Sequence, residues 1–499
     1  MNSKLLLSEK KFIRLKKVLK IKENIKTEIF DRLINITEVI SVTIVGSFID
    51  NEDLSGISDI DTIVICNNLN QKIFDNCVNA IKSIDLNRCG LINYNLKINS
   101  TFGPLKFDKP KLAVIHLMIY DINGHKNHVI SSPFTCFDWE RSKDFVGLSL
   151  VEVYPVGRLQ IRDFKEARRS VENYLIDIKN NSISYREYNF QNTIAKEIIK
   201  QAPLDDRHKG EFAFHIIKNL IMNYYKLCNM KNEVLSKHKV VKQIKNLFSD
   251  NISHIHSEKY LTISSIKEKR EGVFPKYTLD WIEDFIEQFK KNISEEWDEA
   301  IQINFIRHFK TNLNDGTYLG QGRDPEVDYE HIFELNLKQV NKVYSSPLKR
   351  CIQTAKNVHE GIKIISDDRL LEFDYGDAEG LQQEDLTKKY PTVQSSWDIG
   401  EDPHFPNGEN TADVFNRLSN FMNEVSKNFN KKKDDSISIF THNGVLRCLI
   451  GDAYKIRKSD WYKIVIPHGL PLEFLYNKKR FYPNIPRAIL GKLFINIGY

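Results

Sequence analysis

Residues 303–311 read INFIRHFKT, a short apolar run followed at once by basic residues. The run INFI is typical of a buried β-strand, because isoleucine and phenylalanine favour strands. Arg307 and His308 come directly after it. Open α/β sheets bind their ligands at the carboxyl ends of the strands, so this position is typical of a binding or catalytic site rather than of a core.

Three later segments present polar groups in the same way. They read SSPLKR (345–350), LLEFDYGDAEG (370–380) and ISIFTHNG (437–444). They bring Arg350, Glu372 and His442, each after an apolar strand or in a loop bounded by glycine. One Arg-His pair alone would be more typical of a plain strand end. The ordered set favours one shared site.

Together these segments resemble the histidine phosphatase (phosphoglycerate-mutase-like) superfamily. Its signature R-H-G-x-T is matched by residues 307–311, and the match continues through SSPLKRCIQTA, LLEFDYGDAEG, PNGEN and THNGVLRCL. The resemblance implies a three-layer α/β/α domain at 299–499 that needs no metal and takes a small phosphorylated substrate.

The resemblance also implies a role for each matched residue. His308 would attack phosphorus to form a phosphohistidine, which splits one hard step into two easier ones. Arg307, Arg350 and His442 would bind the phosphoryl oxygens, because a guanidinium group can form bidentate hydrogen bonds to the charged oxygens. Glu372 would be the general acid. Further contacts to the substrate are expected from Thr311, Asn314, Glu409 and Asn443.

Two details of this region bear on its activity. The mutases of the family carry a longer insertion, whereas the chain between Glu372 and Glu409 is short, which favours hydrolysis. Phe309 stands where the family has glycine, and glycine at such a position allows close backbone contact. We expect the ring to narrow the phosphate pocket or change its approach, with activity retained.

A second motif lies near the other end of the chain, where residues 44–65 read IVGSFIDNEDLSGISDIDTIVI. Asp59 and Asp61 are two apart in an apolar strand, so they face the same side and suit divalent cations. The amides and hydroxyl around Gly46 and Ser47 suit phosphates. An acidic turn that enters a strand is the plainer alternative.

This motif resembles the nucleotidyltransferase (polymerase-β-like) superfamily, which implies an α/β fold that binds a nucleoside triphosphate with Mg²⁺ or Mn²⁺. The third carboxylate of that family is expected on KLAVIHLMIYD (111–121), where His116 stands, with Asp121 at the far end. Histidine is a poorer ligand than carboxylate for a hard cation. His116 as a metal ligand and His116 as a structural residue therefore both stay open.

The length of 499 residues predicts about two to four domains. Short apolar runs at 39–48, 59–66 and 111–121 read as strands, and with a helix at 71–83 they predict an α/β domain at 1–145 that begins with a basic amphipathic helix. Spacings of three and four, as in FAFHIIKNLIMNYYKL (212–227), predict a mainly helical domain at 146–298. Helices are expected at 347–360 and 410–430 in the third region.

Composition bounds the class of protein. With 41% hydrophobic and 28% charged residues, no apolar stretch of membrane length and no secretory signal, the sequence predicts a cytoplasmic protein with no membrane partner. Its seven scattered cysteines predict free thiols. The net charge of +6 is spread over lysine-rich stretches, which permits an anionic substrate, argues against a nucleic-acid partner and leaves room for a homo-oligomer.

We therefore expect a bifunctional enzyme. Its C-terminal part would hydrolyse a phosphomonoester, and its N-terminal part would transfer a nucleotidyl group to a small acceptor such as a sugar or polyol. Two alternatives stay open. The N-terminal part would be a catalytically dead nucleotide-binding module that regulates the phosphatase, or a nucleotidyltransferase that acts on protein or RNA.

Overall fold

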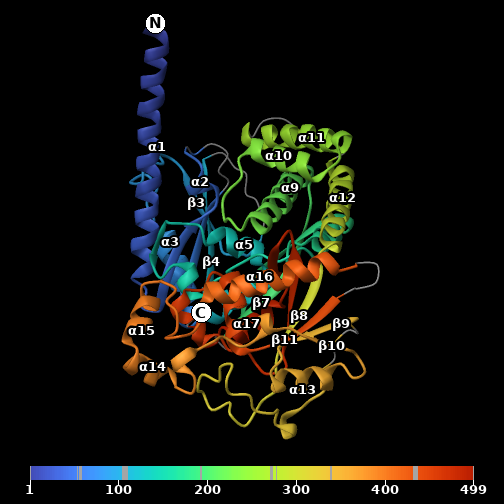
Figure 1. Cartoon of the computed structure of the whole chain (residues 1–499). Helices are drawn as coiled ribbons and strands as arrows, with labels where there is room; N and C mark the ends of the chain where they lie inside the picture. Colours follow the sequence, from blue (N-terminus) through green and yellow to red (C-terminus); the bar gives the residue numbers. More distant parts are fainter. Residues whose placement is uncertain are drawn as a thin grey trace. The chain divides into compact units, whose positions relative to one another are not determined.

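The computed structural model describes residues 2–52, 54, 59–103, 111–191, 194–269, 273–276, 278–335, 337, 340–430 and 436–497. The chain forms two compact units, Met1–Asn292 and Ile293–Tyr499 (Figure 1). A separate helical domain at 146–298 stays a prediction. Within the described ranges, no helix is both long and apolar enough to cross a membrane.

A five-stranded sheet with the order β3-β4-β2-β1-β5 forms the base of the first unit. Its strands are β1 (Val39–Val45), β2 (Ile60–Cys66), β3 (Asn95–Asn99), β4 (Leu112–Asp121) and β5 (Phe145–Gly147). β2 runs parallel to β4 and antiparallel to β1. The strands predicted around 39–48, 59–66 and 111–121 are confirmed, and β3 and β5 are additions to them.

Two helices pack on this sheet. α1 (Asn2–Ile34) is the helix expected at the start of the chain, and α3 (Gln71–Lys82) is the one expected at 71–83. Ile25, Ile29 and Leu33 recur at four-residue spacing, so they form one buried stripe of α1 that belongs to the same core as the sheet. The apolar stripes of the two helices therefore shield the strands that carry the acidic motif.

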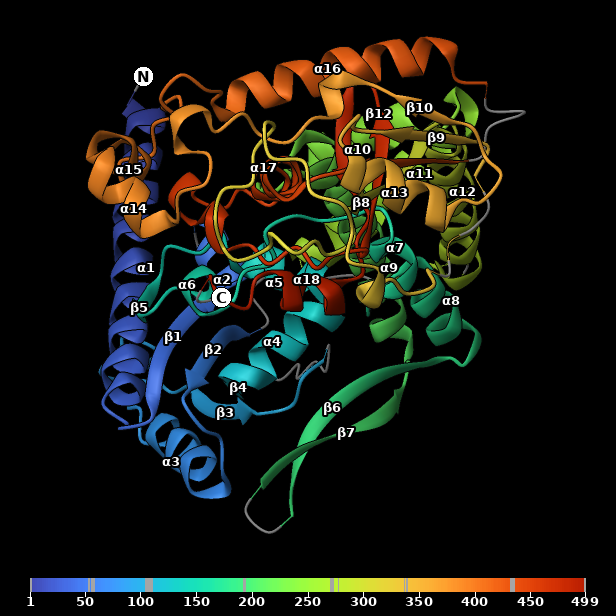
Figure 2. The ribbon, with the colours of Figure 1, turned by 60° about the horizontal axis from the view of Figure 1, so that its bottom comes forward.

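The prediction for 146–298 missed a long β-hairpin. β6 (Ser182–Gln191) pairs with β7 (Ile194–Pro203) in a twisted antiparallel ribbon (Figure 2). The alternation of apolar residues in β6 breaks between Tyr185 and Tyr188, so the period of two was hidden. The other helices of the first unit are α2 (Ser47–Asp50), α4 (Ile122–Ser131), α5 (Pro133–Trp139), α6 (Leu150–Val153), α7 (Asp163–Glu166), α8 (Val171–Lys179), α9 (Asp206–Asn229), α10 (Lys237–Leu247) and α11 (Asp250–Lys269). α12 (Thr278–Asp298) begins in the first unit and ends in the second.

The second unit is built on a six-stranded sheet with the order β10-β9-β11-β8-β12-β13. Its strands are β8 (Ile301–Arg307), β9 (Lys342–Ser345), β10 (Ile364–Ser366), β11 (Ser436–Thr441), β12 (Pro471–Asn477) and β13 (Arg480–Pro483). β10, β9, β11 and β8 are parallel to one another, and β12 and β13 form an antiparallel edge. The strands predicted from INFI and ISIF are β8 and β11.

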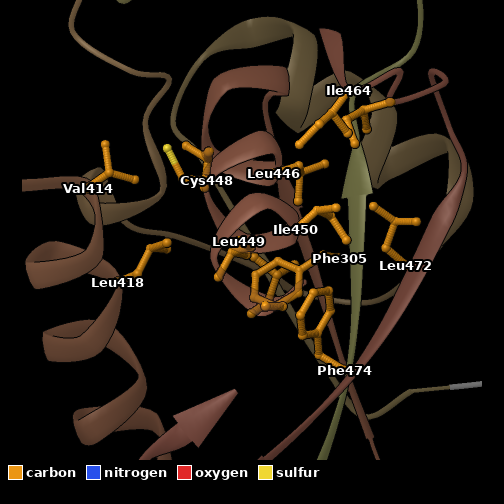
Figure 3. Packing of buried hydrophobic residues seen from close by; sticks show 14 of the residues in the cluster. Phe305, Val414, Leu418, Leu446, Cys448, Leu449, Ile450, Ile464, Leu472 and Phe474 are labelled. Carbon is orange, nitrogen blue, oxygen red and sulfur yellow. The ribbon is translucent and has the colours of Figure 1, made fainter. Parts of the chain in front are cut away.

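Helices lie on both faces of this sheet. Ile303 and Phe305 belong to the core that contains residues of α16 (Thr411–Asn428) and α17 (Asn443–Ala453). Ile306 belongs to a second cluster with Cys351 of α13 (Lys349–Val358). Figure 3 shows Leu446, Leu449 and Ile450 of α17 between the strands and α16. The helices of the unit are α13 (Lys349–Val358), α14 (Gln383–Lys389), α15 (Pro391–Asp398), α16 (Thr411–Asn428), α17 (Asn443–Ala453) and α18 (Arg487–Leu493).

All seven cysteines are free thiols, as the sequence predicts.

Candidate active site

The ends of three neighbouring parallel strands meet at one edge of the second sheet. β11 lies between β8 and β9, with Thr441 opposite Arg307 and Phe440 opposite Ser345. His308 and His442 are the residues after β8 and β11. Because the strands are parallel and in register, side chains that are far apart in the sequence are brought together here.

His308 is held as a neutral base. Its side chain is buried, and Nδ1 lies 2.6 Å from the carbonyl oxygen of Phe309. A carbonyl only accepts, so Nδ1 carries the proton and Nε2 keeps its lone pair. Burial, with the charges of Arg307 and Arg350, lowers the pKa of His308 well below its usual range. Nε2 is therefore available as a nucleophile at neutral pH.

Arg350 and His442 form a fixed pair beside it. Arg350 Nε donates to His442 Nδ1 at 3.3 Å, and its terminal nitrogens donate to the carbonyls of Gly320 and Arg323, each at 2.9 Å. His442 Nε2 lies 2.8 Å from the hydroxyl of Ser346. The rings of His442 and His308 have their centroids 5.4 Å apart. Two of the predicted phosphate ligands are thus held rigidly next to the predicted nucleophile.

Arg307 retains an unused donor. Nη1 donates to the carbonyl of Ile466 at 2.6 Å, whereas Nε is buried and, among the described residues, has no hydrogen-bond partner. Burial and the neighbouring Arg447 lower the pKa of Arg307 to about 10. A buried N–H of a guanidinium without an acceptor is costly in the absence of ligand, so this group suits an anion such as phosphate.

Glu372 lies beside the start of α17, the helix that follows His442. The side chain is buried, and Oε1 accepts from the backbone N–H groups of Phe373 at 2.8 Å and of Gly444 at 3.0 Å. Burial raises the pKa of its carboxyl above the usual value. Gly444 permits this approach, because a Cβ there would come within 2.7 Å of Glu372 Oε1.

Arg417, which the sequence did not reveal, braces the segment that carries Glu372. From α16 it donates to the carbonyls of Arg369 and Leu371 at 2.8 and 2.9 Å, and to that of Glu372 at 3.2 Å. It also pairs with both oxygens of Glu409, at 2.9 and 3.1 Å. No spacing along the chain signals this contact, because it depends on how α16 packs.

Of the four predicted substrate contacts, three make side-chain hydrogen bonds within the protein, and the fourth has a buried acceptor without a partner among the described residues. Glu409 accepts from Arg417 and from the backbone N–H of Asp374, so the structure gives it a bracing contact, and its role as a substrate ligand stays a prediction. Thr311 donates to Asn314 Oδ1 at 3.1 Å. Asn443 begins α17, and its Oδ1 is buried without a partner among the described residues. Asn443 therefore has an acceptor available for a ligand.

Phe309 does not disturb the backbone at the family's glycine position. Its φ is not positive, its ring is fully buried, and it contacts Phe333 with centroids 5.2 Å apart. Gly469 makes room for the ring, since a Cβ there would come within 2.8 Å of Phe309 Cε1. The expected effect of Phe309 on the phosphate pocket stays a prediction, and the backbone needs no glycine here.

His468 is a second residue that the sequence did not reveal. Its Nδ1 donates to the carbonyl of His308 at 2.8 Å, and the two rings lie 5.3 Å apart. Burial, followed by the charge of Arg307, lowers the pKa of His468 to about 4. His308, the predicted nucleophile, thus has a neutral imidazole as its neighbour.

The acidic motif of the first unit is also brought together. Val45 is opposite Asp61 on β1 and β2, and Asp61 is opposite His116 on β2 and β4. Ligand atoms of Asp59, Asp61 and His116 all lie within 4.8 Å of one another. Gly46, with φ of 77°, follows β1 and directly precedes α2, which Ser47 begins. A Cβ at Gly46 would come within 2.7 Å of Asp61 Oδ2, so the Asp61 carboxylate lies against this turn.

The carboxylates of Asp59 and Asp61 offer oxygen atoms, which are the ligands that Mg²⁺ takes. His116 differs from the expected acid. Burial alone would lower the pKa of His116, but the hydrogen bond and charge of Asp61 outweigh it and raise that pKa. The metal-binding role of all three residues stays a prediction.

Comparison with known proteins supports the assignment of the second unit. Residues 303–481 match the histidine phosphatase superfamily (branch 1). Phosphoserine phosphatase 1 of Hydrogenobacter thermophilus is 33% identical over 162 residues, which cover 30% of this chain and 74% of that protein. An uncharacterized phosphatase of Bacillus subtilis is 32% identical over 110 residues, 22% of this chain and 50% of that protein.

Among solved structures, a mycobacterial glucosyl-3-phosphoglycerate phosphatase is 20% identical and covers 37% of this chain and 98% of its own, with a TM-score of 0.33. The family match lies wholly within the second unit. Through this unit the chain belongs to the histidine phosphatase superfamily (branch 1).

Proposed function

We propose that the second unit hydrolyses a small phosphomonoester through a phosphohistidine on His308. The observation that carries this proposal is the hydrogen bond from His308 Nδ1 to the Phe309 carbonyl, which leaves Nε2 unprotonated among cationic groups. A neutral imidazole attacks phosphorus readily, and nearby guanidinium groups stabilise the charge on the phosphoryl oxygens.

The reaction has two balanced steps. In the first, His308 Nε2 forms a bond to phosphorus, the bond from phosphorus to the ester oxygen breaks, and Glu372 gives its proton to the leaving oxygen. In the second, Glu372 takes a proton from water, the water oxygen attacks phosphorus, and the bond from phosphorus to Nε2 breaks. Arg307, Arg350 and His442 bind the phosphoryl oxygens in both steps, and inorganic phosphate leaves.

Hydrolysis is favoured over mutase action by the short chain between Glu372 and Glu409, and both curated relatives reported above are named as phosphatases. The buried Oδ1 of Asn443 has no hydrogen-bond partner among the described residues. It suits a substrate that offers a hydroxyl or amine donor near its phosphate. This supports a small polar ester, such as a phosphorylated amino acid or sugar.

The test is phosphate release from a panel of phosphorylated sugars, amino acids and nucleotides. We expect release by the wild type and a loss of about 10³-fold or more in His308→Ala, since the nucleophile is removed. His331→Ala is the matched control, because His331 is an exposed histidine that pairs with Asp328. Equal rates for His308→Ala and wild type would refute the proposal.

A second activity is proposed for the first unit, where Asp59, Asp61 and the Gly46 turn lie together. We propose that it binds a nucleoside triphosphate with Mg²⁺ or Mn²⁺ and transfers the nucleotidyl group to a small acceptor such as a sugar or polyol. The cation would neutralise charge on the triphosphate. Asp59 and Asp61 would hold it, and the backbone at Gly46 and Ser47 would approach the phosphates.

Pyrophosphate release from each nucleoside triphosphate, with the acceptor panel and Mg²⁺, tests this second activity. We expect release by the wild type and none by Asp61→Asn. Triphosphate binding without pyrophosphate release would instead favour a regulatory nucleotide-binding module. Radiolabel that appears on protein or RNA would favour a macromolecular acceptor.

A further inference from the structure

The imidazole of His116 is hydrogen-bonded on both sides. β2 and β4 are parallel neighbours with Asp61 opposite His116, so the two side chains project from adjacent positions on one face. His116 Nδ1 lies 2.8 Å from Asp61 Oδ1, and Nε2 lies 2.6 Å from the carbonyl oxygen of Thr101, just beyond β3. The ring therefore bridges a carboxylate and a backbone carbonyl.

These two contacts use both of the ring's bonding directions. Each imidazole nitrogen has a single in-plane direction for a proton or a lone pair. Nε2 must carry a proton, because the Thr101 carbonyl only accepts. Nδ1 is aimed at Asp61 Oδ1, at a distance and angle suited to a hydrogen bond. A nitrogen of His116 could therefore bind a cation only by leaving its oxygen partner.

Asp61 is thereby fixed from two sides. Oδ1 is bonded to His116, and Oδ2 lies so close to Gly46 that a Cβ would approach it to 2.7 Å. Metal-binding carboxylates are commonly oriented by hydrogen bonds from residues that do not touch the ion. Hard cations such as Mg²⁺ and Mn²⁺ favour the oxygen atoms of carboxylates over imidazole.

We propose that His116 is a positioning residue that orients Asp61, and that a divalent cation at this site is bound by oxygen atoms of Asp59 and Asp61, without nitrogen. The inference rests on the metal-binding part of the proposed function of the first unit. It assigns to His116 a role different from the ligand role considered from the sequence, in which one nitrogen would have to leave its oxygen partner.

Pulsed electron paramagnetic resonance of the full chain with bound Mn²⁺ tests this directly. A directly bound imidazole nitrogen modulates the electron spin echo of Mn²⁺, whereas an oxygen-only set of protein ligands does not. We expect Mn²⁺ to bind without nitrogen modulation. The wild type suffices for this measurement, so it does not depend on the folding of a variant.

Titrations of two His116 variants with Mn²⁺ test whether the hydrogen bond to Asp61 supports metal binding. His116→Asn places an amide near the position of Nδ1 and keeps a donor for Asp61, whereas His116→Ala keeps none. We expect the Kd for Mn²⁺ to rise about 10- to 100-fold in His116→Ala and to stay within about threefold of wild type in His116→Asn. His125→Asn, at another buried histidine of the same unit, is the control and should leave the Kd unchanged.

The outcomes separate this inference from the proposal on which it rests. Nitrogen modulation from bound Mn²⁺, or an equal loss of affinity in His116→Asn and His116→Ala, would overturn the inference and leave the metal site standing. Absence of any Mn²⁺ binding by the wild type would overturn both.

Discussion

Replacing Glu372 with glutamine should separate the chemistry of this side chain from its structural contacts. Oε1 accepts from the N–H groups of Phe373 and Gly444 at 2.8 and 3.0 Å, and a glutamine oxygen keeps both bonds. What Glu372→Gln removes is the proton. We expect kcat for alkyl phosphates to fall about 10²- to 10⁴-fold, which is the usual contribution of general acid catalysis. For p-nitrophenyl phosphate, whose leaving group needs little protonation, the loss should be about tenfold or less.

The pH dependence gives a second signature. The pKa of Glu372 is raised by burial, and that of His308 is lowered by burial and by Arg307. The nucleophile must be neutral and the acid protonated, so kcat/KM should rise with pH through the pKa of His308 and fall through that of Glu372. The alkaline limb should disappear in Glu372→Gln.

Stability should move in the opposite direction to activity. A folded-state pKa above the unfolded value means that the carboxyl contributes stability at low pH and loses it as the pH rises through the folded pKa. At pH 7 the glutamine variant, which never ionises, should have a thermal midpoint equal to or above that of the wild type. Glu379→Gln is the control, because Glu379 also accepts from backbone N–H groups, those of Gly322 and Arg323.

Rates on alkyl phosphates within about threefold of wild type would refute the assignment of Glu372 as the acid, since even weak general catalysis contributes more. An unchanged alkaline limb would do the same. A large fall in the thermal midpoint would show that the fold needs the charge itself.

Three further predictions concern residues around the site. Arg417→Lys should lower kcat about 10- to 100-fold with little change in KM, because a lysine cannot brace the segment of Glu372 at several points; steady-state kinetics would show it. Gly469→Ala should lower the free energy of unfolding by about 1–3 kcal/mol in urea titrations, because φ is 71° and a Cβ would meet Phe309. His468 has a pKa of about 4 when folded, so the folded state binds fewer protons than the unfolded chain, and stability should fall as the pH drops from 7 to 4. In His468→Asn, thermal unfolding should show a shallower fall.

Much of the site could be predicted because each predicted catalytic residue closely follows a strand or lies in a loop bounded by glycine. Apolar runs locate β8 and β11, and parallel neighbours necessarily bring Arg307, His308 and His442 to one edge. Arg417 could not be found this way. Its contacts to the segment of Glu372 depend on the rotation of α16 against the sheet, which no local pattern encodes.

In the first unit the pattern showed where His116 stands but not what it does. That depends on Thr101, which lies beyond β3, a strand with too few apolar residues to be recognised. The hairpin of β6 and β7 was missed because its alternation is irregular, and the helical spacing around it dominated the interpretation.

The placement of β8 has a consequence in time as well as in space. β8 leads directly into His308 and is the first strand of the unit along the chain, yet its partners in the sheet are β11 and β12, which come near the end of the unit. Pairings so distant in sequence form late, because a long loop must close before they contribute. During synthesis His308 emerges from the ribosome long before the strands that flank β8, so we expect phosphatase activity to appear only late in the folding of this unit. The rate at which activity returns after denaturation would then report the rate at which β8 pairs with β11 and β12.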